Sequence, residues 1–146
     1  CFIMDYLKVL VEEIHSVVVA TVDETGHPHT TVMDMMWEDG KTVYFLTADF
    51  KPLYKRLKED GRVAVTGMTQ GAGTMDRKSI SLTGQVEWIG KEHLEELLKA
   101  NPYMYEIYPT EEGRSHLQVF RFKNAVGNFY DLTQLPPYQA RFEIEG

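Results

Sequence analysis

Alternation of apolar and polar side chains is the feature of this sequence that most limits its fold. Between Lys78 and Ile89 every second side chain is apolar, and the ones that would share a face are Ile80, Leu82, Val86 and Trp88. A period of two indicates a β-strand with one buried face. The chain must therefore build part of its core from a sheet.

Similar strand patterns recur along the chain, separated by short turns. Runs rich in β-branched and aromatic residues predict further strands over 17–22, 29–37, 42–47, 62–66, 117–122 and 125–132. Asp39-Gly40 predicts a tight hairpin between two of them, because this dipeptide tolerates the positive φ that such turns require. Strands joined mainly by hairpins pair antiparallel.

Three short helices accompany these strands. Apolar residues at helical spacing predict helices over 3–15 and 91–100, and Pro52 is suited to the first turn of a third, over 52–58. We expect an α+β fold: a closed, mainly antiparallel barrel with helices 3–15 and 91–100 packed outside it. With 146 residues, of which 43% are hydrophobic, the chain suits one domain over 1–146.

Charge and composition exclude several classes of protein. With 15 basic and 22 acidic residues the net charge is −7, which argues against a general nucleic-acid binder. The single cysteine, Cys1, excludes an internal disulfide framework. The longest strongly apolar run, Val17 to Val22, is too short to cross a membrane, and no signal-peptide pattern is visible. We expect a soluble, cytoplasmic protein.

No motif for catalysis by the chain's own side chains is evident. His27 and His29 would share one face of a strand, but no carboxylate lies at ligand spacing, so we predict polar residues at a strand start and no metal site. The Gly-x-Ser-x-Gly motif and the glycine fingerprints of nucleotide-binding loops are missing from the sequence. If the protein is an enzyme, a bound cofactor does the chemistry.

A cluster of cations follows the expected strand that ends near Thr47. Five of the basic residues lie within a span of twelve, namely Lys51, Lys55, Arg56, Lys58 and Arg62. A strand end, a hydroxyl group, a lysine and a helix N-terminus together suit a phosphate group, which Lys51 and Lys55 would both reach. The alternative is a solvated basic helix face.

Two segments carry a resemblance to a known family. ATVDETGHPHTTV (20–32) and VYFLTADFKPLYKRLKEDGRVAV (43–65) resemble the FMN-binding split barrel of the pyridoxamine 5′-phosphate oxidase-like superfamily, and a looser similarity extends over 17–132. The resemblance implies a split β-barrel and a homodimer that binds FMN at the subunit interface.

The resemblance also implies which residues bind FMN. The strand along the flavin ring, the following strand end and the basic helix supply His29, Thr30, Thr31, Val32, Met33, Asp34, Leu46, Thr47, Lys51 and Lys55. Ser79 corresponds to a residue that the partner subunit contributes, and Tyr130 to an aromatic residue near the C-terminus.

The sequence departs from a true vitamin B6 oxidase at four cationic positions, which here are Thr31, Met36, Pro52 and Leu53. The substrate-binding tail of those oxidases is not seen either. The resemblance therefore implies an FMN-dependent oxidoreductase of an unknown small substrate. The alternatives are a non-catalytic flavin binder, serving electron transfer or sensing, and a relative that binds deazaflavin or haem, for which His27 and His29 are candidate ligands.

Overall fold

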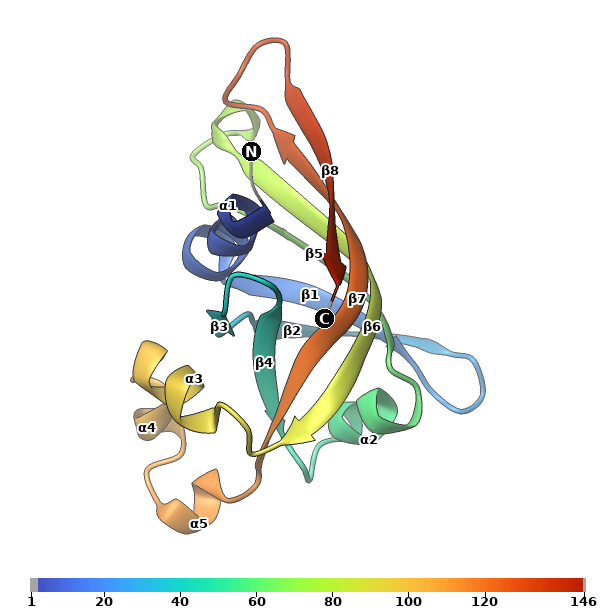
Figure 1. Cartoon of the computed structure of the whole chain (residues 1–146), viewed down its shortest axis with the longest axis vertical. Coiled ribbons are helices and arrows are strands. Elements are labelled where there is room, and N and C mark those ends of the chain that lie inside the picture. Colours follow the sequence, from blue (N-terminus) through green and yellow to red (C-terminus); the bar gives the residue numbers. More distant parts are fainter. Residues whose placement is uncertain (1–2, 146) are drawn as a thin grey trace.

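The computed structural model of the chain describes residues 3–145, and a curled antiparallel sheet dominates it (Figure 1). Its strands are β1 (Ser16–Val22), β2 (Pro28–Asp34), β3 (Trp37–Glu38), β4 (Val43–Ala48), β5 (Arg62–Met68), β6 (Lys78–Gly90), β7 (Leu117–Asp131) and β8 (Tyr138–Glu145). They pair in the order β2-β1-β5-β6-β7-β4-β3, and β8 pairs with β7. The sheet forms a half-barrel, which confirms the expected α+β split-barrel class.

The two edges of the sheet belong to one continuous segment. β2 and β3 are separated only by Met35 and Met36. The backbone N–H of Met35 donates to the carbonyl of His15 at 2.7 Å, and that of Met36 donates to the carbonyl of Tyr44 at 3.0 Å. This segment therefore joins the β1 side of the half-barrel to the β4 side, where β3 pairs with β4.

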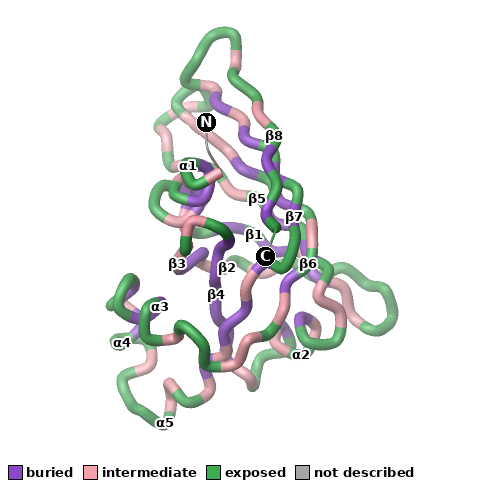
Figure 2. The backbone as a smooth tube through the Cα atoms, viewed as in Figure 1, coloured by how far each residue is buried: buried purple, intermediate pink, exposed green. Residues whose placement is uncertain are grey.

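β4 is covered on both faces. Val43 and Phe45 belong to the core inside the half-barrel, whereas Tyr44 and Leu46 belong to a second apolar cluster with residues of the segment 97–104. All six of its residues are buried, as the purple trace of β4 in Figure 2 shows. A continuous apolar run is what a strand buried on both faces requires.

The short helices are α1 (Ile3–Lys8), η1 (Val9–Ile14), α2 (Pro52–Glu59), η2 (Thr74–Asp76), α3 (Leu94–Ala100), α4 (Met104–Ile107) and α5 (Glu111–Arg114). The first two contribute Tyr6, Leu7, Leu10 and Ile14 to the core of the half-barrel. The helix expected over 3–15 is present, but its second half, η1, is a wider π-helix. α2 begins with Pro52 as predicted, because the first helical position needs no N–H donor.

Five sequence-based expectations need correction. The barrel, expected to be closed, is a half-barrel with β2 and β3 as its edge strands. The strand expected over 29–37 is two strands, β2 and β3, separated by Met35 and Met36. The strands expected over 117–122 and 125–132 are one strand, β7, and an additional strand, β8, follows it. Trp88, expected on the buried face of β6, is 45% exposed. It lies beyond the core, near the end of the strand, where the Lys58 ammonium sits 4.2 Å from its ring centroid and its Nε1 donates to Gln118.

Candidate functional site

A cavity of about 530 Å³ lies between β2, β4, the start of α2 and the segment that includes α4, and we call it the β2 cavity. Its volume is typical of small-molecule sites. It is lined by Thr31, Val32, Met33, Asp34, Leu46, Thr47, Ala48, Lys51, Pro52, Leu53, Arg56, Met104, Ile107, Tyr108 and Leu117. Seven of the residues predicted from the sequence to bind FMN are among them.

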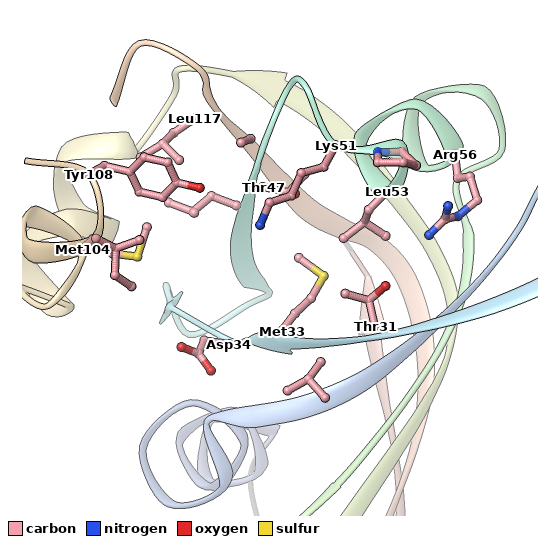
Figure 3. Close-up of a pocket in the computed structure, with 15 residues that line it drawn as sticks. Thr31, Met33, Asp34, Thr47, Lys51, Leu53, Arg56, Met104, Tyr108 and Leu117 are labelled. Carbon is pink, nitrogen blue, oxygen red and sulfur yellow. The ribbon is translucent and has the colours of Figure 1, made fainter. Parts of the chain in front are cut away.

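The cavity has a cationic end, where β4 leads into α2. Lys51 caps α2 in an extended conformation, and its side chain points into the cavity alongside the buried Thr47 (Figure 3). Arg56 is the second cation on the lining, and its Nε donates to Thr21 Oγ1 at 2.8 Å. The first turn of α2 adds a helix N-terminus, which favours an anion.

The structure places Lys55 away from this end and puts Arg56 there instead. Lys55 is exposed and does not line the β2 cavity. Because Lys51 is extended, helical spacing begins only at Pro52, and one turn after Pro52 and Leu53 comes Arg56. Pro52 was the available sequence signal, because helical spacing counted from this residue, and not from Lys51, places Arg56 on the face of α2 toward the cavity.

Asp34, the last residue of β2, lies on the cavity lining away from Arg56 (Figure 3). Its two carboxylate oxygens accept hydrogen bonds from different elements, Oδ1 from Ser16 Oγ and Oδ2 from the Tyr103 hydroxyl, each at 2.7 Å. Burial, with the hydrogen bond to Asp34, raises the pKa of Tyr103 well above its ordinary value. Tyr103 is therefore a neutral hydroxyl group at physiological pH.

Apolar side chains form the walls between the two ends. Met33 comes from β2 and Leu53 from α2, while Met104 and Tyr108 cover the cavity from the far side of β4 (Figure 3). The segment 104–108 was missed by sequence reasoning, because its short helix carries no recognisable motif. Only the fold brings it next to β2.

The other predicted residues lie outside the β2 cavity. His29 and Thr30 are exposed near the start of β2, where His29 Nε2 and Asp23 Oδ2 lie 2.8 Å apart. Ser79 and Tyr130 are paired across β6 and β7. Ser79 lines a second cavity of about 580 Å³ on β1, β5 and β6, which we call the β1–β5 cavity.

The β2 cavity and the β1–β5 cavity meet at Val32, which lines both. Val32 is 70% exposed and lies directly opposite Val18, and Met68 on β5 is also exposed. The face formed by Val18, Val32 and Met68, which we call the Val32 face, is therefore an apolar surface that reaches the rim of the β2 cavity.

Within residues 3–145 no group of three or more His, Cys, Asp or Glu side chains is placed to hold a metal ion. Nor does any described helix have the length and apolar character needed to cross a membrane.

An antiparallel half-barrel of this kind, with an edge strand that lines an apolar cavity, has the architecture of the split-barrel class. The family model for pyridoxamine 5′-phosphate oxidase matches residues 3–130. The chain belongs to this family. A comparison of the sequence with curated proteins finds no match.

Solved structures show the same fold at low sequence identity. A NimC/NimA family protein from Clostridium acetobutylicum is 21% identical, with a TM-score of 0.74 over 97% of this chain and 90% of that one. A heme-binding protein from Mycobacterium smegmatis is 13% identical, with a TM-score of 0.70 over 94% and 57%. A structure titled F420 reductase is 20% identical, with a TM-score of 0.61 over 79% and 90%.

Proposed function

We propose that the protein binds FMN in the β2 cavity and acts as an FMN-dependent oxidoreductase on a small substrate. The observation that carries this proposal is the polarity of the cavity: cations lie at one end, and apolar walls lead to a hydrogen-bonded carboxylate at the other. Such an arrangement suits a long ligand with an anionic group at one end and a flat aromatic ring at the other.

The residues that would hold FMN divide by chemistry. Lys51, Arg56 and the hydroxyl group of Thr47 would bind the phosphate group, and the cations would offset the −7 charge of the chain locally. Met33 and Leu46 would contact the ring and keep water from it. When bound, FMN would supply the transfer of a hydride or of single electrons.

We also propose that the active form is a homodimer that pairs through the Val32 face. A partner packed on this surface would reach the rim of the β2 cavity at Val32. Ser79, the residue that the family resemblance assigns to the partner subunit, lines the cavity on this same face. This geometry supports a ligand site that two subunits complete.

The absorbance spectrum of the freshly purified protein is the first test. A flavoprotein should show an absorbance band near 450 nm. The band should disappear when FMN is removed and return when FMN is added back. A Soret band would instead indicate haem, as in the name of the M. smegmatis neighbour. Steady-state assays with NAD(P)H and candidate acceptors would then separate an enzyme from a non-catalytic flavin binder.

The cationic end gives a sharper test with a matched control. A hydrogen bond to a charged group contributes about 1.5–3 kcal/mol, so Lys51→Ala should weaken FMN binding about 10- to 150-fold by the usual 1.4 kcal/mol per tenfold. Lys55→Ala removes a cation four residues along that does not line the cavity, and it should change FMN affinity less than threefold, roughly 0.6 kcal/mol.

Riboflavin, which lacks the phosphate group, is the ligand control for this experiment. It should bind the parent and both variants about equally, as measured by quenching of flavin fluorescence. If the parent binds riboflavin as tightly as FMN and Lys51→Ala changes neither affinity, the basic cluster is only a solvated helix face and the phosphate assignment is wrong.

A further inference from the structure

Asp34, which lines the β2 cavity, is connected to His15 through the hydroxyl group of Tyr103. The Tyr103 oxygen lies 2.7 Å from Asp34 Oδ2 and 2.8 Å from His15 Nε2. His15 Nε2 and Asp34 Oδ2 are 3.5 Å apart, too far for a good direct hydrogen bond. The tyrosine hydroxyl group is therefore the bridge between the two.

His15 faces a different cavity, of about 480 Å³, which we call the His15 cavity. Its lining includes the carboxylates of Glu12 and Glu38 as well as His15. The His15 side chain is 29% exposed and so reaches solvent. The three bridged side chains thus connect the β2 cavity with a separate, acidic opening on the surface.

The backbone around His15 is built to hold the ring in this position. The π-helix η1 ends at Ile14, and His15 itself has φ 61° and ψ −64°, a conformation that residues other than glycine rarely adopt. Its Nδ1 lies 3.0 Å from the carbonyl of Val11. A carbonyl only accepts, so Nδ1 carries a hydrogen and Nε2 is the atom that exchanges a proton with Tyr103.

Two arrangements of the protons satisfy both hydrogen bonds that link His15, Tyr103 and Asp34. In the first, imidazolium Nε2–H of His15 donates to the Tyr103 oxygen, and the Tyr103 hydroxyl donates to the carboxylate of Asp34. In the second, protonated Asp34 donates to the Tyr103 oxygen, and the Tyr103 hydroxyl donates to neutral Nε2. Going from the first arrangement to the second, one proton moves from His15 Nε2 to the Tyr103 oxygen, and the original Tyr103 proton moves to Asp34. His15 loses its positive charge and Asp34 loses its negative charge.

We propose that Asp34, Tyr103 and His15 form a proton relay between the β2 cavity and the surface at the His15 cavity. The relay rests on the proposed function for the identity of the group that gives or takes the proton in the β2 cavity. The raised pKa of Tyr103 agrees with this role, because a neutral hydroxyl group donates and accepts at once whereas a tyrosinate cannot donate. Asp34 lies beside His15, and Glu12 and Glu38 line the same cavity as His15. The negative charge of these carboxylates attracts hydronium ions to the opening.

The first test uses the protein without cofactor. In protein with ¹⁵N-labelled histidine, the neutral His15 ring should carry its hydrogen on Nδ1, and a slowly exchanging hydroxyl proton of Tyr103 should be detected. Tyr103→Phe should abolish the hydroxyl signal and leave the Nδ1 assignment unchanged. A neutral ring with its hydrogen on Nε2 would overturn the relay, because Tyr103 could then no longer pass a proton to it.

The second test uses FMN-loaded protein, reduced with dithionite and mixed with oxygen, in mixtures of H₂O and D₂O. The parent should show a curved dependence of rate on the deuterium fraction, because two protons move together. Tyr103→Phe should react about 100-fold more slowly, the lower range for proton transfer by a positioned side chain, and the curvature should disappear. Tyr105→Phe, an exposed tyrosine in α4, is the matched control and should behave as the parent.

His15→Asn provides a second variant, because asparagine tolerates positive φ but cannot carry the relayed proton. It should be as slow as Tyr103→Phe. If FMN binds and both variants keep the parent rate and isotope effect, the relay is wrong and the proposed function stands. If FMN does not bind, the proposed function fails, and the histidine spectra alone decide whether the relay exists.

Discussion

At the scale of single residues, a carboxylate fixes the turn between β3 and β4. Asp39 Oδ1 accepts from the backbone N–H groups of Lys41 and Thr42, each at 2.9 Å, and Oδ2 accepts from the Tyr44 hydroxyl at 2.7 Å. Burial alone would raise the pKa of Asp39, but these hydrogen bonds outweigh it and hold the pKa below its usual value.

This lowered pKa predicts how stability depends on pH. The stabilisation by ionised Asp39 is present above the pKa of the unfolded chain, about 3.9, and it is lost as pH falls through the lower pKa of the folded state. Asp39→Asn should reduce the free energy of unfolding by about 1 kcal/mol at pH 7, measured by urea unfolding. The difference from the parent should shrink below about pH 4; Glu24→Gln, in an exposed turn, is the control. A difference that does not depend on pH would contradict the role of the charge.

The residues of the site differ in how far the sequence could predict them. Thr47 and Lys51 could be predicted from the sequence, because a strand end followed by a helix start is a local pattern. Tyr103 was not, because its partners Asp34 and His15 are distant in the sequence, and nothing around residue 103 marks a polar contact. Local patterns predict local geometry, whereas the relay depends on the packing of three separate segments.

At the scale of elements, most strands and helices could be predicted because alternation and turn residues are local signals. β8 was not predicted, since Pro136 and Pro137 directly precede it and prolines mark a turn or loop and not a strand. The alternation of Tyr138, Ala140, Phe142 and Ile144 was the signal available. The sequence predicts two strands in place of β7, because the polar pair Lys123-Asn124 interrupts the apolar pattern of this segment.

β8 contributes to the core through Phe142. The Phe142 ring stacks on Tyr6 of α1 with centroids 4.8 Å apart, and it covers Gly127, where a Cβ atom would lie 2.3 Å from the ring. Phe142→Ala should therefore reduce the free energy of unfolding by about 3–5 kcal/mol. Arg141→Ala, at the neighbouring exposed position, should change it by less than about 0.5 kcal/mol. Equal effects in chemical denaturation would show that β8 lies loosely on the sheet.

At the scale of the whole molecule, the Val32 face predicts an assembly. Val18→Lys places a charge at the centre of this face without touching the lining of the β2 cavity. Light scattering should give a mass near twice 16.8 kDa for the parent and near 16.8 kDa for this variant. Val126→Lys, on β7, has nearly the same exposure, 37% against 39%, and should leave the mass unchanged. A monomeric parent at micromolar concentration would contradict the dimer and the shared site.

The pairing of β4 with β7 determines when the β2 cavity forms. Thr47 in β4 lies opposite Gln118 in β7, and Leu117 forms part of the wall of the β2 cavity. A ribosome synthesises β2, β4 and the start of α2, which carries the cationic end of the cavity, long before it reaches β7. Pairing between strands that are far apart in the sequence is slow. For most of its synthesis the nascent chain therefore lacks a complete β2 cavity. Capture of FMN, as proposed here, would thus be a late event in the biogenesis of the protein, and FMN would not serve as a template for its first folding steps.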